Sequence, residues 1–389
     1  MEIRDLTEDD LNQALDVRSR SFGPLASGNR DEWNRMQKRS IADGRSLAVE
    51  DGGRVVATAR INDFRQWWAG RAVRMAGVGG VVVLPEVRGR GVGSALMAAV
   101  IERSRELGFP LSALYPATVP VYRGVGYELA GVQRIASISA AALRTLAGRG
   151  PYVDVRRPAV ADAEAITQLI AGLHERNRDC GPIEYRAVEW ASDIEDDEYF
   201  TYVAEDGFVG YGFEDGGDTL RISHLVAGSE ATLRTLWSMV GSGSSVVKTV
   251  RAPIATDDPL IWMLADRGLT IDRETWWMLR LADAEAAVAG RGYPSTVDVD
   301  VRLRLTDPLV AANDGDFRLT VAAGTGSLIR TDGGAAPQLD LSARALAALY
   351  AGWPLHTLRR TGLVTGGDTD ADAQLDAAFV ARPYMLDYF

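Results

Sequence analysis

A glycine-rich loop lies between a run of valines and an amphipathic segment at residues 84–96, which read LPEVRGRGVGSAL. The preceding residues 77–84, GVGGVVVL, are rich in β-branched side chains and end before Pro85, which predicts a strand. In residues 94–107 the apolar side chains recur with helical spacing, and Gly108 follows as a stop signal, so this segment is predicted to be a helix. The loop is therefore a strand-to-helix turn.

Such a turn is suited to bind an anion, most naturally a phosphate. Glycines let the backbone approach a ligand closely, and the first N–H groups of a helix have no partner inside it. Together with the helix dipole, these groups attract negative charge. No Lys-Ser or Lys-Thr follows the glycines, as a Walker loop requires, and Gly89, Gly91 and Gly93 lack the spacing of the dinucleotide fingerprint. What remains is Arg88-x-x-Gly91-x-Gly93 after a valine strand.

Length and composition limit the remaining function classes. The 389 residues are enough for two or three domains, and a hydrophobic content of 47% supports sizeable cores. The formal net charge of −11 argues against a nucleic-acid partner and is compatible with a small cationic one. The single cysteine excludes an intramolecular disulfide, and three widely spaced histidines predict no metal site. Because the chain has neither an apolar run of about 18 residues nor a signal-peptide core, we expect no membrane partner and a cytoplasmic location.

The chain divides by pattern into three segments, which we expect to be domains at 1–146, 147–288 and 289–389. The first segment alternates strands and helices and contains a hairpin around residues 51–53. The second repeats the same order from Val153 onward, but LVAGSEATLR replaces the phosphate loop, with one glycine and no arginine in frame. The third combines short alternating strands with helices, which is typical of a small α+β domain.

The glycine loop resembles the pyrophosphate loop of the GNAT acetyltransferases, R/Q-x-x-G-x-G/A, which binds coenzyme A. The second segment resembles a GNAT unit that cannot bind coenzyme A in the same manner, and the third resembles a sterol carrier protein. In this order the segments resemble the enhanced intracellular survival (Eis) family, most specifically in VVVLPEVRGRGVGSALM, PVYRGVGYE and LDAAFVARPYMLDYF. The expected fold is α/β and α+β: tandem GNAT-like domains, the first active and the second degenerate, followed by a sterol carrier protein-like domain.

The resemblance implies an N-acetyltransferase that moves an acetyl group from acetyl-CoA to amines of small cationic substrates such as aminoglycosides or polyamines. It also implies a hexamer, whereas the expectation of no metal rests on the cysteine and histidine content. The competing hypothesis is a non-catalytic binding protein that uses the sterol carrier-like domain and keeps the first GNAT unit as a relic. The intact loop favours the enzyme, because a relic should have lost it, as the second segment did.

The resemblance also assigns the residues that meet acetyl-CoA. The backbone of Val81 and Val83 would run beside the pantetheine arm, which is compatible with core packing of their side chains. Arg90 is left open between a phosphate contact and a surface charge. The residues that would line the pyrophosphate are Arg88, Gly89, Gly91, Val92 and Gly93.

Tyr122, in VYRGVGY, takes the family's general-acid position. A phenol with a reference pKa of about 10 stays protonated at neutral pH and can protonate the departing thiolate. Tyr115 and Tyr127 are nearby alternatives, and Tyr122 could also be an ordinary half-buried tyrosine. The implied general base is the C-terminal carboxylate of Phe389, with a reference pKa of about 3.5. Although chain ends usually fray, the tail PYMLDYF is apolar and aromatic, which favours its burial.

Two further residues are candidate substrate contacts. Trp33 corresponds to an aromatic wall of the amine pocket, with core packing as the alternative. The family often has an acidic residue directly before the last aromatic one, whereas this chain has Tyr388 there and Asp387 one residue earlier. We therefore take Asp387 as the candidate substrate ligand of the tail. The acidic run at residues 193–198 is interpreted as a solvated face.

Overall fold

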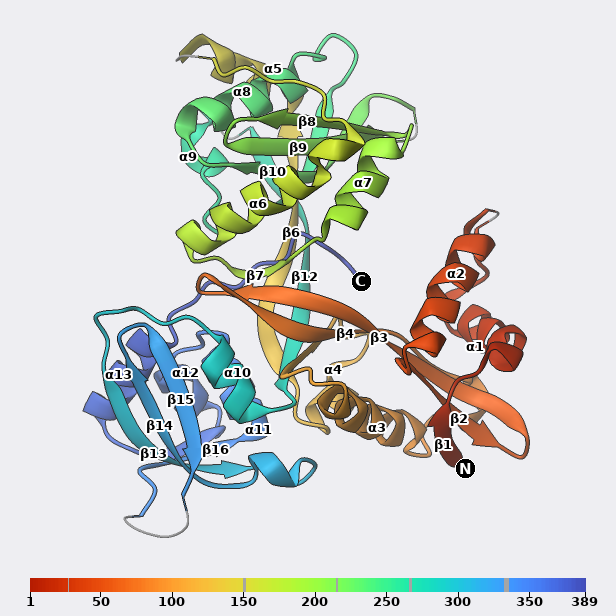
Figure 1. The fold of residues 1–389 in the computed structure, drawn as a ribbon, viewed down its shortest axis with the longest axis vertical. Coiled ribbons are helices and arrows are strands. Elements are labelled where there is room, and N and C mark those ends of the chain that lie inside the picture. Colours follow the sequence, from red (N-terminus) through yellow and green to blue (C-terminus); the bar gives the residue numbers. More distant parts are fainter. Residues whose placement is uncertain (27, 150–151, 215, 266–267, 332–335) are drawn as a thin grey trace.

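The structure of the protein is a computed structural model that describes all residues except 27, 150–151, 215, 266–267 and 332–335. Figure 1 shows three lobes, formed by the first, middle and last parts of the chain, which meet around the long strands β6 and β12. A twelve-stranded mixed sheet runs through the first two lobes, and a five-stranded sheet forms the third. Among the described residues, no helix has the length and hydrophobicity that a membrane span requires.

The first lobe has the predicted alternation of strands and helices. The hairpin of β2 and β3 turns at residues 51–54, as predicted. Before α1, the backbone N–H and hydroxyl of Thr7 both donate to the Asp10 carboxylate, at 2.9 and 2.8 Å. The elements are β1 (Glu2–Asp5), η1 (Glu8–Asp10), α1 (Leu11–Phe22), α2 (Asn29–Ala42), β2 (Ser46–Asp51), β3 (Arg54–Trp68), β4 (Arg71–Val83), η2 (Pro85–Val87), α3 (Val92–Glu106), β5 (Leu111–Leu114), α4 (Val119–Arg123) and β6 (Glu128–Ser139).

The second lobe repeats this order, with one departure from prediction. The strand expected from Val153 is reduced to a single bridge between Arg156 and Val203, because Pro158 has no N–H to continue a ladder. The elements are α5 (Ala140–Arg144), η3 (Thr145–Arg149), η4 (Val160–Asp162), α6 (Ala163–Asn177), β7 (Cys180–Ile183), α7 (Ala187–Glu195), β8 (Tyr199–Ala204), β9 (Gly207–Phe213), β10 (Thr219–Ala227), α8 (Glu230–Gly241), β11 (Thr249–Ile254), α9 (Leu260–Met263) and β12 (Leu269–Leu281).

The third lobe is the predicted α+β domain. Its sheet has the order β15-β14-β13-β16-β17, and its inward side chains, such as Val301, Leu303 and Phe317, are fully buried. The elements are α10 (Ala284–Gly290), β13 (Val299–Thr306), η5 (Ala311–Asn313), β14 (Gly315–Ala322), β15 (Thr325–Arg330), β16 (Leu339–Ser342), α11 (Ala343–Tyr350), α12 (Leu355–Arg360), β17 (Val364–Gly366) and α13 (Thr369–Ala378).

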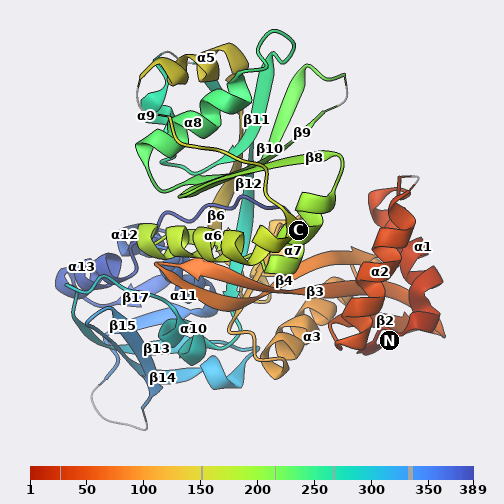
Figure 2. The same cartoon turned by 45° about the horizontal axis from the view of Figure 1, so that its top comes forward.

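Strands β6 and β12 each pass from one of the first two lobes into the other (Figure 2). Through residues 278–281, β12 pairs with β5 of the first lobe, and through residues 269–279 it pairs with β6. Residues 134–139 of β6 pair with β11 of the second lobe, and residues that follow β6, such as Leu143, pack in that lobe's core. The end of the segment that we assigned to the first domain therefore lies in the second lobe, and the shared strands fix the two lobes relative to each other.

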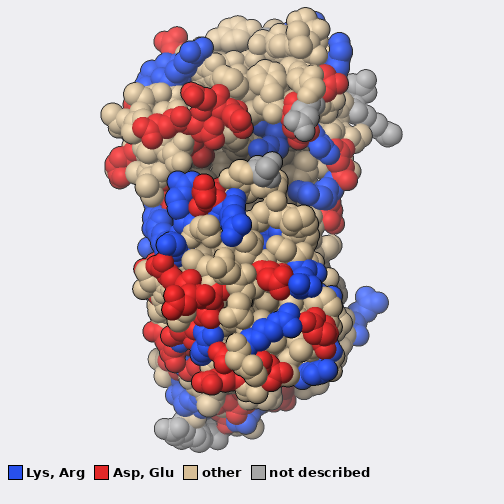
Figure 3. All heavy atoms as spheres, turned by 90° about the vertical axis from the view of Figure 1, so that its right-hand side faces the viewer, with Lys and Arg blue, Asp and Glu red and all other residues tan. Residues whose placement is uncertain are grey.

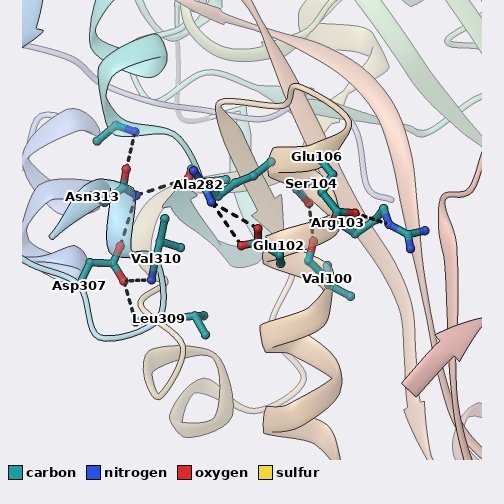
Figure 4. Close-up of polar contacts among 12 residues, drawn as sticks. Val100, Glu102, Arg103, Ser104, Glu106, Ala282, Asp307, Leu309, Val310 and Asn313 are labelled. Carbon is teal, nitrogen blue, oxygen red and sulfur yellow. Dashed lines mark hydrogen bonds and ion pairs between the residues drawn. The ribbon is translucent and has the colours of Figure 1, made fainter. Parts of the chain in front are cut away.

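A buried polar cluster attaches the third lobe beside α3 (Figure 4). Asp307 forms an ion pair with Arg280 at the end of β12, and both side chains are almost completely buried. The amide of Asn313 donates to backbone carbonyls at residues 281–282 and accepts from the N–H of Ala284 at 3.0 Å. Because buried polar groups need such partners, this cluster fixes how the third lobe, and the tail that follows it, meet the rest of the chain.

Candidate active site

The glycine loop forms the turn between β4 and α3. Gly89 and Gly91 have φ angles of +76° and +80°, and no heavy atom lies within 4 Å of a Cβ built on either residue. The helix begins at Val92, two residues before the predicted start, with Gly91 as its N-cap; no side chain caps it and its first turn has no acid. The first N–H groups of α3 are therefore left for an external anion, as a phosphate site requires.

The second half of β4 lies beyond the pairing of this strand with β5. The described pairing of the two strands ends at Gly77. On the other side, a bulge shifts the register with β3 between Gly79 and Val82, and Gly80 within it has a φ of +61°. Bulges of this kind redirect the backbone and occur next to active sites. Val81 and Val83 are half buried on either side of buried Val82.

Arg88 folds back over the end of β4. Its Nε donates to the carbonyl of Val83 at 3.0 Å, and its Nη2 lies 3.4 Å from the Ser21 hydroxyl oxygen. The side chain is otherwise exposed, and a guanidinium has five N–H donors. Arg88 therefore stabilises the turn, and its remaining N–H donors can bind an anion.

The three tyrosines considered for the acid differ in their hydrogen bonds. The Tyr127 hydroxyl is buried and lies 2.6 Å from the Ser112 hydroxyl, and the Tyr115 hydroxyl donates to the Asp387 carbonyl at 2.6 Å. Tyr122 is 6% exposed, and its hydroxyl has no hydrogen bond with any described residue. Burial raises the pKa of the Tyr122 phenol. Of the three tyrosines, therefore, only Tyr122 has a hydroxyl that makes no hydrogen bond with a described residue and can donate its proton to a ligand.

The C-terminus lies against β4 (Figure 2). The carboxyl carbon of Phe389 is 3.8 Å from a Cβ built on Gly79, and its ring is 3.2 Å from one built on Gly77. The ring packs edge-on against Phe64 and Tyr115, with centroids 5.2 and 5.5 Å away. The chain end is thus packed beside the bulge of β4 rather than frayed, with Phe389 half buried.

Asp387 anchors the tail. Its Oδ1 accepts a hydrogen bond from the Tyr185 hydroxyl at 2.6 Å and lies 3.3 Å from Nε2 of His224. Tyr388 is 64% exposed, and its ring stacks on Tyr115 with centroids 4.4 Å apart. The carboxylate that we predicted as a substrate ligand is therefore already engaged with the protein.

Trp33 belongs to the hydrophobic core of the first lobe, where its side chain is 8% exposed. This placement corresponds to the packing alternative. The acidic run differs from its prediction at one residue: Asp193 is partly buried beside the tail, which raises the pKa of its carboxyl.

Two cavities meet at the tail and share Tyr185, Asp193, Asp387 and Tyr388. One, of about 550 Å³, lies next to Phe389 between β3, β4 and α7. The other, of about 770 Å³, lies on the second lobe between β10 and β11. Figure 3 shows the molecule hollowed between its upper and lower parts, with acidic side chains gathered on the upper rim. Sequence patterns missed Tyr185 and His224, because isolated aromatic residues in a half-buried segment carry no spacing signal.

The start of α8 in the second lobe is closed to a phosphate. The hydroxyl of Ser229 accepts from the N–H of Thr232 at 3.2 Å, so the first turn is capped internally. The Asp206 carboxylate accepts from the Thr232 hydroxyl and lies 3.1 Å from a Cβ built on Gly228. A negative charge thus occupies the place where α3 leaves an anion site, which supports the prediction that this unit is degenerate.

Comparisons with known proteins agree with this geometry. Residues 2–130 and 177–281 match models described as "Acetyltransferase (GNAT) domain", and residues 284–386 match a "Sterol carrier protein domain". The crystal structure of a GCN5-related N-acetyltransferase from Kribbella flavida is 48% identical, with a TM-score of 0.94 over 100% of this chain and 98% of that one. The chain belongs to the GCN5-related N-acetyltransferases.

Similarity to named Eis proteins extends along the chain. N-acetyltransferase Eis of Mycobacterium tuberculosis is 28% identical over 85% of this chain and 84% of its own length. Eis1 of Mycobacterium abscessus, at 23% identity and a TM-score of 0.78, shares the fold over the full length of both chains. The predicted similarity to the Eis acetyltransferases and the predicted order of the three domains are confirmed. The protein is an N-acetyltransferase, and as a GNAT enzyme it takes its acetyl group from acetyl-CoA.

Proposed function

We propose that this enzyme acetylates an amine of small polycationic substrates, with Tyr122 as the general acid and the Phe389 carboxylate as the general base. The observation that carries the proposal is the position of the chain end beside Gly79, at the bulge of β4. The backbone of Val81 and Val83 on that strand would hold the pantetheine arm. Arg88 and the loop residues 89–93 would bind the pyrophosphate.

The two proposed groups have complementary protonation states at neutral pH. A terminal carboxylate is ionised and can accept a proton from a cationic amine, directly or through water. The Tyr122 phenol stays protonated, since burial raises its pKa above the ordinary value near 10. It can therefore donate its proton to the thiolate that leaves when the acetyl group is transferred.

The cavity beside Phe389 supports a cationic substrate. Three of its acids already pair with arginines: Glu184 with Arg65, Asp63 with Arg74, and Glu189 with Arg186. Asp193, which is partly buried, has no Lys or Arg partner among the described residues. Since a carboxylate removed from water is stabilised by an opposite charge, Asp193 and the nearby terminus favour a substrate with more than one ammonium group.

We also propose that the enzyme assembles as a hexamer, as the Eis resemblance implies. Trp262 is 85% exposed and Ile261 beside it is 44% exposed, which supports burial of this region in an assembly. A monomer in light scattering would refute the assembly without affecting the proposed chemistry.

The proposed function is tested by mixing the untagged protein with acetyl-CoA and a panel of amines, and titrating the thiol that is released. We expect release with polyamines or aminoglycosides and little with neutral monofunctional acceptors. If no polycationic amine supports release by protein that binds acetyl-CoA, the proposed substrate class is wrong.

Gly91→Asp is expected to abolish binding of acetyl-CoA. The change places a negative charge at the N-cap of α3, where phosphate should lie, and a side chain at a φ of +80°. Gly53→Asp is the matched control, because Gly53 also has a φ of +80° with no atom near its Cβ position but lies in the β2–β3 turn. Calorimetry should find normal affinity in the control and none in Gly91→Asp. Equal affinity of the two folded variants would exclude this loop as the phosphate site.

Asp193→Asn is expected to raise KM for polyamines several-fold while changing KM for a monoamine little. Loss of the negative charge at this partly desolvated position weakens binding only of those substrates whose second ammonium group reaches it. Asp197→Asn, in the same acidic run but exposed, is the control. Equal effects of both variants on polyamine KM would indicate long-range attraction rather than a contact.

A further inference from the structure

The first and second lobes contain equivalent pairs of parallel strands. In the first lobe, β4 pairs in parallel with β5 through Met75–Gly77. In the second lobe, β10 pairs in parallel with β11 through Thr219–Arg221. In each lobe the helix between the two strands, α3 or α8, follows the first of them. The end of β10 is thus the counterpart of the end of β4, where the pantetheine arm is proposed to bind.

The C-terminal tail lies beside the ends of β10 and β11. Tyr384 and Leu386 line a cavity with Leu225 and Ala227 of β10 and Pro253 next to the end of β11. The backbone is held there by Tyr384 N–H to the Cys180 carbonyl and Met385 N–H to the Val132 carbonyl, both at 3.1 Å. Gln133 donates to the carbonyl of Leu386 at 3.0 Å. The backbone of residues 384–386 is therefore fixed by hydrogen bonds to β6 and β7, where the first two lobes meet.

The surrounding strands are shaped for close passage of the tail. A Cβ built on Gly181 of β7 would lie 1.9 Å from the carbonyl oxygen of Tyr384. A Cβ built on Gly131 of β6 would lie 2.4 Å from the carbonyl oxygen of Pro383. No larger residue fits at either place without displacing the tail. The tail therefore packs directly against the backbone of β6 and β7, beside the unit whose phosphate site is closed by Asp206.

The geometry points to Tyr185 and His224 of the degenerate unit as positioning residues, which hold Asp387 and thereby place the Phe389 carboxylate at the acetyl site. This inference rests on the proposed role of that carboxylate. Asp387 is the last tail residue bonded by the second lobe, and two residues of extended chain span at most about 7 Å. The rings of Tyr185 and His224 are themselves packed against each other and against buried Trp190, with centroids 4.8 to 5.1 Å apart. Tyr185 and His224 are therefore held rigidly, and Asp387, to which they bind, is close enough to Phe389 to fix the position of its carboxylate.

The test compares Tyr185→Phe with Tyr202→Phe in the full-length, untagged enzyme. Tyr185→Phe keeps the ring and removes the hydroxyl that donates to Asp387, whereas Tyr202 stacks on Tyr211 within the second lobe. We expect Tyr185→Phe to lower kcat about 10- to 100-fold, since a misplacement of about 1 Å can cost about 10²-fold. The KM values for acetyl-CoA and the amine should stay unchanged. Hydrogen exchange of a peptide covering residues 380–389 should become faster, and Tyr202→Phe should change neither kcat nor exchange.

Asp387 provides a second measurement. Asp387→Ala removes the acceptor of both anchoring groups and should lower kcat as Tyr185→Phe does, whereas Asp387→Asn keeps an oxygen acceptor for Tyr185 and should restore part of the rate. A raised amine KM in Tyr185→Phe with normal kcat would overturn the inference in favour of a substrate contact. Suppose that C-terminal amidation inactivates the enzyme, but Tyr185→Phe changes neither kcat nor hydrogen exchange. The role of Tyr185 as a positioning residue would then be refuted, and the role of the Phe389 carboxylate as the base would stand. If amidation is harmless, the proposed base and this inference both fail.

Discussion

Replacing Tyr122 by phenylalanine is expected to lower kcat by about 10²-fold or more, the usual scale for loss of a general acid. Affinity for acetyl-CoA and the melting temperature should stay as in the unmodified enzyme. The reason is that the Tyr122 hydroxyl makes no hydrogen bond with any residue that the structure describes, so its removal leaves no partner unsatisfied. The measurement is steady-state kinetics with a saturating amine, together with calorimetry and a thermal melt.

Tyr127→Phe is the matched control for this prediction. It removes a hydroxyl that lies 2.6 Å from the hydroxyl of Ser112 in the buried core. Loss of such a buried bond costs about 1–3 kcal/mol of stability, so this variant should melt earlier but retain its turnover in the folded state. The opposite pattern, with Tyr127→Phe inactive and Tyr122→Phe active, would show that the acid is Tyr127.

Much of the phosphate loop could be predicted because its signals are local. The valines predict β4, the glycines predict a turn, and the apolar spacing predicts α3; only the helix start at Val92 differs by two residues. Helix α8 and the strands of the third lobe could also be predicted from local signals. In the strands, buried and exposed side chains alternate, as in β13. Local chemistry also predicted that the second phosphate site is lost.

The exchange of β6 and β12 between the lobes could not be predicted. Both strands pair with partners that lie far away in the sequence, and such pairing leaves no local pattern. The anchoring of Asp387 was missed for the same reason: Tyr185 and His224 lie 202 and 163 residues before it and meet it only through the tertiary fold. The packing of Trp33 likewise depends on the sheet beneath α2.

One residue added after Phe389 is expected to inactivate the enzyme, although it deletes nothing. The terminal carboxyl carbon is 3.8 Å from a Cβ built on Gly79, and the last ring is wedged between Phe64 and Tyr115. An extra residue converts the carboxylate into a neutral amide and moves the new charge along the chain. Because a misplacement of about 1 Å can cost about 10²-fold, we expect at least that loss in kcat. Binding of acetyl-CoA and the melting temperature should be unchanged, since the loop and the cores are untouched.

The control is the same extension at the N-terminus, which lies away from the tail and where Met1 is exposed (Figure 1). Amidation of Phe389 tests the effect of the charge without a steric change, because it keeps the shape of the chain end and removes only its negative charge. If the carboxylate is the base, the amidated and the extended enzymes should both be inactive. If the tail only packs, amidation should be harmless and Phe389→Leu, which loses the contacts with Phe64 and Tyr115, should be the more damaging change. Full activity of the amidated enzyme would direct the search for the base to a bound water or to an acidic side chain such as Asp193.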